Sequence, residues 1–162
     1  MIKFYDSASR KFPQGATHVA LYYDGLYAAP MDEPFPYRRW ITIEGGAATA
    51  RYAGIADFEH LNPVYDDSGR LRDWTAERKA IGKRARIYCN RSDAHLALEQ
   101  TSGLPRLFWI ATLDNHQWTP AELIADLKNN FGADISESEL WANQYAGGTN
   151  ADYDTSNLFG DW

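Results

Sequence analysis

The stretch Tyr-Ala-Gly-Ile-Ala-Asp-Phe-Glu-His, residues 52–60, is an apolar run that ends in two carboxylates. Asp57 and Glu59 are two residues apart, so on a β-strand their side chains point to the same face. At about 3.3 Å per residue, their Cα atoms would lie roughly 6–7 Å apart. Two carboxylates on one face of a buried strand are the minimum equipment for acid and base catalysis at a glycosidic bond.

The spacing of the two acids carries little weight alone. With 22 acidic residues in 162, chance gives (22/162)² × 160, or about three, pairs of acids two residues apart. The sequence contains three such pairs, Asp57/Glu59, Glu137/Glu139 and Asp152/Asp154. The case for a site therefore depends on what surrounds Asp57 and Glu59.

Apolar runs rich in strand-forming residues recur on both sides of this stretch and predict further strands. Helical spacing predicts a helix over 71–81, a second over 92–100 and a third that begins at Thr119 and runs to about Asn130. The proline-rich segment 24–39 is expected to be a loop. The expected strands are 3–6, 18–23, 40–44, 52–59, 85–90, 106–112, 139–145 and 152–159.

The alternation of strands and helices, with continuous apolar runs, indicates an α/β fold with a mostly parallel sheet. About eight strands suggest a barrel, but a full (β/α)₈ barrel usually needs about 250 residues. We therefore expect one domain over residues 1–162, an irregular, trimmed, TIM-like (β/α) barrel with incomplete helices. An open doubly wound parallel sheet is the alternative.

Composition excludes several classes of function. The net charge of −6 and a pI near 5.1 argue against a non-specific nucleic-acid binder. A single cysteine, Cys89, rules out an internal disulfide and a cysteine-based zinc site, and its place in an apolar run predicts a buried side chain. The four histidines show no metal-ligand spacing, and no phosphate-binding loop is present, so we expect no metal and no cofactor. The first residues contain no long apolar run, so neither a signal peptide nor membrane insertion is expected.

Polar and aromatic residues stand at most of the expected strand ends, where sites gather in parallel α/β folds. A lone acid after a strand is more often a helix cap or a turn residue, and we give each roughly one chance in four of being functional. Their concentration raises the joint odds. The residues of interest at these ends are Asp6, Tyr23, Asp24, Glu44, Asp57, Glu59, Tyr88, Asn90, Gln144, Tyr145 and Asp154, with Trp109 inside a strand.

Several short motifs, in this order, resemble glycoside hydrolase family 25, the lysozymes of the Chalaropsis type, and its short actinobacterial and phage relatives. Phe4-Tyr5-Asp6-Ser7 is similar to the family's opening Asp-x-Ser, and Ile55 to Glu59 is similar to its Asp-x-Glu strand. Trp141 to Tyr145 is similar to its Trp-Gln-Tyr, although Asn143 stands before Gln144. The segments 86–90, 108–111 and 153–159 complete the set, whereas 24–39 matches nothing in the family.

The resemblance implies an N-acetylmuramidase that cleaves the β-1,4 bond between N-acetylmuramic acid and N-acetylglucosamine in peptidoglycan. It implies Glu59 as proton donor and Asp57 as its helper, with Asp6 beside them and Asp154 lining the cleft. Such a chain would be the catalytic domain of a phage endolysin, a monomer held in the host cytoplasm until released to the wall. Substrate-binding candidates are Asp154, Tyr23, Asp24, Tyr88, Asn90, Trp109, Gln144 and Tyr145.

The residues support the same chemistry on physical grounds. A carboxylate lowers the energy of the positively charged, oxocarbenium-like transition state, while a second carboxyl must keep its proton for the leaving oxygen. Asp57 beside Glu59 would raise the pKa of one of the two. For Trp109, a place in the core is at least as good an interpretation as sugar stacking. The alternative function is a non-catalytic glycan-binding or virion structural module on the same barrel.

Overall fold

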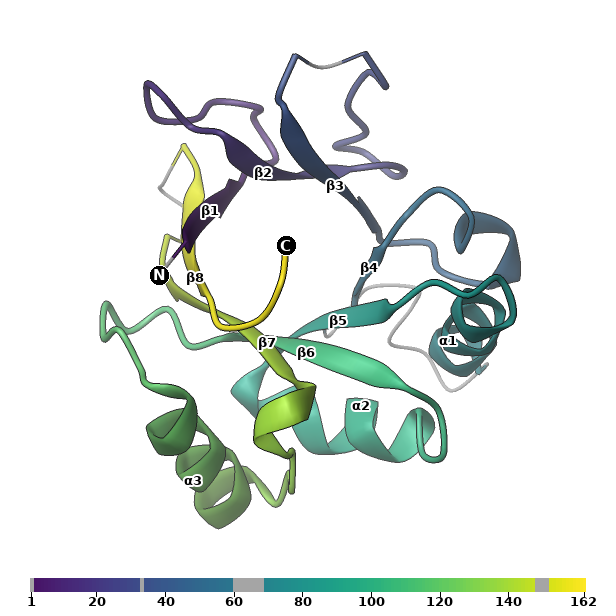
Figure 1. Ribbon diagram of the computed structural model, residues 1–162, viewed down its shortest axis with the longest axis vertical. Coiled ribbons are helices and arrows are strands. Elements are labelled where there is room, and N and C mark those ends of the chain that lie inside the picture. Colours follow the sequence, from purple (N-terminus) through teal and green to yellow (C-terminus); the bar gives the residue numbers. More distant parts are fainter. Residues whose placement is uncertain (1, 33, 60–68, 148–151) are drawn as a thin grey trace.

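The computed structural model describes residues 2–32, 34–59, 69–147 and 152–162, and it forms a closed eight-stranded barrel (Figure 1). The strands lie in sequence order around the barrel, and β1 to β7 are parallel. β8 runs antiparallel to both of its neighbours, β7 and β1. The strands are β1 Ile2–Asp6, β2 His18–Tyr22, β3 Tyr37–Thr42, β4 Ile55–Asp57, β5 Ala85–Asn90, β6 Arg106–Ala111, β7 Leu140–Ala146 and β8 Asp154–Leu158.

Three α-helices cover only part of the barrel. They are α1 Arg70–Ala80, α2 Ala94–Gln100 and α3 Pro120–Phe131, and all lie on the side of β4 to β7 (Figure 1). Short 3-10 turns precede or follow them at Ala47–Thr49, Arg91–Asp93 and Glu137–Glu139. Thr119 and Glu122 form a capping box at the start of α3, as the Thr-Pro-x-Glu signal predicts.

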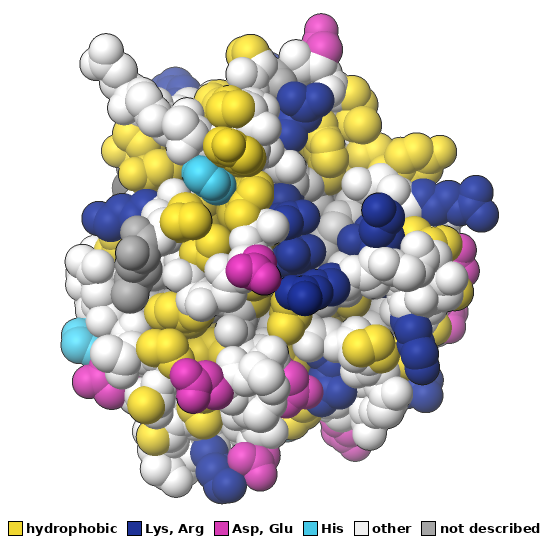
Figure 2. All heavy atoms as spheres, in the orientation of Figure 1, with side chains coloured by type: hydrophobic (Ala, Val, Ile, Leu, Met, Phe, Trp, Pro, Cys, Tyr) yellow, Lys and Arg dark blue, Asp and Glu magenta, His cyan; other side chains and the backbone are white. Residues whose placement is uncertain are grey.

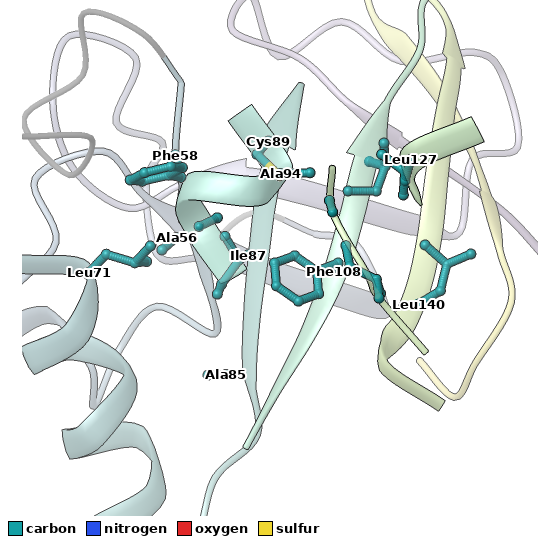
Figure 3. Close-up of a cluster of buried hydrophobic side chains, with 14 of the residues drawn as sticks. Ala56, Phe58, Leu71, Ala85, Ile87, Cys89, Ala94, Phe108, Leu127 and Leu140 are labelled. Carbon is teal, nitrogen blue, oxygen red and sulfur yellow. The ribbon is translucent and has the colours of Figure 1, made fainter. Parts of the chain in front are cut away.

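The outer core fills the space between these helices and the barrel wall (Figure 3). Outward-facing residues of β4 to β7, such as Ile87 and Phe108, pack against Leu71 of α1 and Leu127 of α3. Cys89 belongs to this core and is fully buried, as its sequence context predicts. Among the described residues, no helix covers the outer side of β2, and loop residues such as Phe12 and Phe35 pack there instead. Covering one side with loops explains how the barrel closes in so short a chain.

The interior of the barrel is a second core, rich in aromatic rings. Phe4, Tyr88, Trp109 and Trp141 meet there, with ring centroids 4.6 Å apart for Tyr88 and Trp109 and 4.9 Å apart for Phe4 and Trp109. Alternate residues on the strands share this inward direction. The residues two positions before and two positions after these rings on the same strands therefore also point inward. Their side chains lie at the two ends of the barrel interior.

The closed barrel excludes the open doubly wound sheet and confirms the expected α/β class. The expected strand 85–90 has the observed bounds, most others differ by one or two residues, and two differ by more. β3 begins at Tyr37, not Trp40, and ends at Thr42, because Asp24 accepts hydrogen bonds from the Thr42 hydroxyl and, at 2.7 Å, from the Ile43 backbone N–H. β4 covers Ile55–Asp57 rather than 52–59, because a turn around residues 49–53 uses the preceding backbone.

No helix among the described ranges is both long enough and apolar enough to cross a membrane.

Candidate active site

Three carboxylates come together at the end of the barrel where the parallel strands finish. Asp6 is the last residue of β1 and Asp57 is the last residue of β4. Asp154 is the first residue of β8, and because β8 is antiparallel its start lies at this same end. Asp6 and Asp154 are direct cross-strand partners. Side chains directly opposite on antiparallel strands lie about 5 Å apart at Cβ, so these two like charges repel.

Glu59 joins the three from just beyond β4. The Phe58 N–H donates to the Tyr88 carbonyl at 2.8 Å, which continues the pairing of β4 and β5 past Asp57. Phe58 is fully buried in the outer core, as expected from its position between the two acids. The alternation that sends Phe58 outward leaves Asp57 and Glu59 on the inward side. We refer to Asp6, Asp57, Glu59 and Asp154 as the acidic cluster.

Burial and mutual repulsion hold a proton on Asp6. Its side chain is 5% exposed, and its pKa is raised well above the usual aspartate value. Burial is the largest cause, and the charges of Asp154, Asp57 and Glu59 add to it. Three like charges around a poorly solvated carboxyl favour its protonated form, because ionisation would place a further negative charge there.

Glu59 is the more accessible acid and also has a raised pKa. Its side chain is half-buried, whereas Asp57 is only 4% exposed. Burial is the main cause of the shift, with repulsion from Asp93 and Asp154. Hydrogen bonds with Tyr88 and Asn90 oppose the shift, because they stabilise the carboxylate. The arrangement gives a partly exposed carboxyl that keeps its proton to higher pH than an ordinary glutamate.

Tyr22 lines the acidic cluster and was missed in the sequence, where Tyr23 was expected instead. The Tyr22 pKa is raised by burial and by the charges of all four clustered acids. Tyr22 follows the inward-facing Ala20 by two residues, so the alternation along β2 could have identified it. Tyr23 lies past the strand and stacks on Tyr52, with ring centroids 5.2 Å apart. Two phenols, Tyr22 and Tyr88, therefore face the acids.

Gly147 is the second site residue missed in the sequence. Its backbone has φ +137°, and a Cβ there would stand 1.8 Å from an Asp154 carboxylate oxygen and 2.9 Å from the Asp154 Cα. Any side chain at 147 would therefore push Asp154 away from Asp6. Only glycine fits at this position, where the chain leaves β7 close to the start of β8.

Three other predicted binding residues are buried, and a fourth lies at the end of β3. Trp109 is fully buried and its Nε1–H donates to the Ser156 hydroxyl at 3.0 Å, so it has no exposed face for a sugar. Gln144 is also fully buried, and Tyr145 is 7% exposed. Asp24 caps the end of β3 and is not part of the acidic cluster. Tyr88 and Asn90 do reach the cluster, through Glu59.

Within the described ranges, no group of three or more His, Cys, Asp or Glu side chains is arranged to hold a metal ion. His60 lies outside the described residues. Burial raises the pKa of the Cys89 thiol well above its usual value, so the residue stays a protonated part of the core.

The proton on Asp6 predicts a pH-dependent stability. The folded protein holds this proton more tightly than the unfolded chain does, so the contribution of Asp6 to stability falls as pH rises from the unfolded toward the folded pKa. Asp6→Asn, which cannot ionise, should raise the free energy of unfolding at pH 8 by about 1–2 kcal/mol, with a smaller gain at pH 4. Urea unfolding at both pH values measures this.

The exposed Asp32→Asn is the matched control and should give no pH-dependent gain. An effect of Asp6→Asn on stability that is no more favourable at pH 8 than at pH 4 would show that folding does not raise the pKa of Asp6.

No protein-family model matches the chain, and no curated protein matches it. A solved structure does match over nearly the full length of both molecules, the 1.07 Å crystal structure of an uncharacterized B. stearothermophilus protein. The TM-score is 0.60 at 13% sequence identity, and the match covers 98% of this chain and 96% of that one. At this identity the likeness shows a shared fold alone.

Proposed function

We propose that the chain is a glycoside hydrolase that cleaves peptidoglycan, an N-acetylmuramidase of the lysozyme type. The acidic cluster is the observation that supports this proposal most. Its four carboxyl groups come from distant parts of the chain and repel one another at one end of the barrel. A site of this kind at the carboxyl ends of parallel strands is where barrel enzymes carry their chemistry. In this proposal the barrel is a trimmed relative of the (β/α)₈ class.

Glu59 is the proton donor in the proposed reaction. It is the cluster's partly exposed acid with a raised pKa, so it can be protonated and still reach a bound glycan. Its proton goes to the glycosidic oxygen as the bond from the anomeric carbon to that oxygen breaks. Water then adds to the anomeric carbon and gives up a proton, which restores the acid form of Glu59.

Asp57 and its neighbours stabilise the charge that develops on the sugar. The transition state is positive at the anomeric carbon, and carboxylates in a poorly solvated site stabilise it strongly. Asp57 assists Glu59 directly, by charge or by orienting the substrate's acetamido group. Asp6 is a further carboxyl of the site that can hold a proton. Asp154, which is half-buried, is placed beside the bound glycan in this proposal.

The proposed substrate is the glycan strand of peptidoglycan, which needs no metal or cofactor for this hydrolysis. The role that fits is the catalytic domain of a phage endolysin that acts as a monomer. Such a protein would wait in the host cytoplasm until it is released to the wall. The net charge of −6 is compatible with a neutral or cationic ligand rather than with nucleic acid.

Release of new reducing ends tests the proposal. Purified protein incubated with actinobacterial cell walls should clear the suspension and release sugar reducing ends, and borohydride reduction followed by hydrolysis should place them on muramic acid. Reducing ends on glucosamine instead would indicate a different glycosidase. Clearing without any reducing ends would contradict the proposal.

A second candidate, a glycan-binding or virion structural module, is favoured by the burial of Asp6 and Asp57, which are 5% and 4% exposed. It predicts that the protein co-sediments with walls and never produces reducing ends. The same incubation therefore separates the two candidates.

A further inference from the structure

Arginines gather at the other end of the barrel, where the parallel strands begin. Arg39 of β3 and Arg86 of β5 each stand two residues before an inward-facing core residue, Ile41 and Tyr88, so they point into this end of the barrel. Arg84 lies just before β5. Figure 2 shows the barrel from this end, and Lys and Arg side chains gather near the middle of the face.

These guanidinium groups have no ion-pair partner among the described residues. Among the residues that the structure describes, no carboxylate oxygen lies within 4 Å of Arg39, Arg84 or Arg86. Arg86 is 5% exposed, and its buried Nε has no hydrogen-bond partner among them; the same is true of the Arg39 Nε. Unpartnered buried groups of this kind are rare in native proteins and require an explanation.

Tryptophan rings hold Arg39 and Arg86 in place. The Arg86 guanidinium lies 4.8 Å from the Trp141 ring centroid, and that of Arg39 lies 5.2 Å from the Trp162 ring centroid. Stacking on a ring fixes a guanidinium plane and leaves its N–H edge for a further partner. The arginines are therefore positioned without being neutralised.

Arg78 has a different role, because all three of its guanidinium nitrogens donate to backbone carbonyls. It donates to the Arg84 carbonyl from Nε at 3.1 Å and from Nη2 at 2.8 Å, and to the Ala50 carbonyl from Nη1 at 2.8 Å. These bonds fix the connection between α1 and β5. Arg78 is thus a positioning residue for Arg84.

A pocket of about 330 Å³ adjoins Arg84 and has a cationic wall. Lys79, Lys83, Arg84 and Arg106 line it, and no acidic residue does. Arg106 is paired with Glu139 at 3.3 Å, which leaves the two lysines and Arg84 as the available charges. The remaining lining is mainly apolar, from Ala85, Pro105 and Leu107.

A neighbouring pocket of about 260 Å³ shares Arg84 and Leu107 but also contains Glu137 and Asp161. Its mixed charge makes it a poorer place for an anion.

The arginines at this end repel one another. Burial lowers the pKa of Arg86 to about 9, and repulsion from Arg39, Arg78 and Arg84 adds to this effect. In a chain with a net charge of −6, this local excess of positive charge is an isolated feature.

We propose that this end of the barrel binds a phosphate-bearing ligand. Arg84 and Arg86, with Arg39, hold the phosphate, and the adjoining cationic pocket takes the rest of the molecule. Planar guanidinium groups match a phosphate with paired hydrogen bonds, and the volume suits a ligand of sugar phosphate size with an apolar surface. The inference is independent of the proposed hydrolase, whose site lies at the opposite end.

Thermal unfolding at increasing inorganic phosphate, with sodium chloride keeping the ionic strength constant, tests the site. The wild-type Tm should rise with phosphate, since a ligand that binds only the folded state stabilises it. Arg84→Ala, at an exposed position, should raise the Kd for phosphate at least about tenfold. The control Lys128→Ala removes a cation from the distant helix α3 and should respond as the wild type does.

Arg86→Met gives a second measurement of opposite sign. Without phosphate it should raise the Tm, because it removes a buried charge and keeps the packing on Trp141, and with phosphate it should show no further rise. A lower Tm without phosphate would contradict the proposal. A wild-type shift that sodium chloride alone reproduces, or an Arg84→Ala response equal to that of the wild type, would overturn it.

Two further probes separate the possible sources of the phosphate. Tighter binding of glycerol phosphate than of dimethyl phosphate would assign the site to soluble phosphate monoesters. The reverse order would assign it to a phosphodiester-linked polymer. Failure of inorganic phosphate, glycerol phosphate and dimethyl phosphate alike to stabilise the wild type would also overturn the proposal.

Discussion

Glu59→Gln is expected to lower kcat/KM for the release of reducing ends from peptidoglycan by about 10²–10⁴-fold, the range that a general acid contributes. Glutamine keeps the size and polarity of the side chain but has no proton to donate. The substitution removes a half-buried carboxyl and its repulsion with Asp93 and Asp154, so the fold should be retained. Circular dichroism and the thermal unfolding profile verify the fold.

The pH profile provides a second test of this assignment. Because Glu59 must be protonated to act, wild-type activity should fall as pH rises through its raised pKa. The residual activity of Glu59→Gln should lack that alkaline fall. Glu44→Gln makes the same chemical change at an exposed position after β3 and should keep wild-type activity. If Glu59→Gln retains more than about a tenth of the wild-type value, another group donates the proton.

Trp109→Ala is expected to lower the free energy of unfolding by about 3–5 kcal/mol, the usual cost of deleting a large buried aromatic side chain. Trp109 has no exposed surface and packs against Phe4, Tyr88 and Trp141 in the barrel interior. The substitution leaves a cavity there and removes the hydrogen bond to Ser156. Urea unfolding followed by far-UV circular dichroism measures the loss.

Two other substitutions separate the contributions. Trp109→Phe keeps an aromatic ring but removes the donor to the buried Ser156 hydroxyl, so it should cost about 1–3 kcal/mol. Tyr52→Ala deletes a 55% exposed ring that stacks on Tyr23, and it should cost less than about 1 kcal/mol. A Trp109→Ala variant that unfolds like the wild type but binds glycan weakly would identify Trp109 as a sugar platform instead.

Much of the barrel was predictable because runs rich in apolar, strand-forming residues mark most of its strands. The expected 85–90 strand matches β5, and those at 3–6 and 106–112 differ from β1 and β6 by one residue. The error at the end of β3 comes from hydrogen bonding between residues distant in sequence, whereas β4 is shortened by a local turn around residues 49–53. Asp24 ends β3 by binding Thr42, a contact 18 residues away that no local pattern shows. Short strands are also bounded by their partners rather than by their own propensity.

The acidic residues of the candidate site could be predicted from the sequence, whereas the residues that surround them were harder to predict. Asp6, Asp57, Glu59 and Asp154 stand at strand ends, where barrel topology alone brings them together. Tyr22 was missed because it stands next to Tyr23. Only the direction of alternate side chains on β2 shows which of the two tyrosines faces the acids. The arginines at the other end were missed for the same reason: Arg39 and Arg86 look like solvent-facing charges until alternate positions on β3 and β5 are known to point inward.

The reversed direction of β8 has a consequence for how the chain assembles on the ribosome. β1 pairs with β8 from Ile2 to Asp6, and the partners Phe4 and Ser156 are 156 − 4 = 152 residues apart in sequence. The free edge of β1 therefore stays open until β8 has been synthesised, and the barrel closes only then. The same event brings Asp154 to Asp6 at one end and carries Trp162 toward Arg39 at the other. The pairing of β8 with β1 thus completes the acidic cluster at one end of the barrel and the arginine group at the other in the same step.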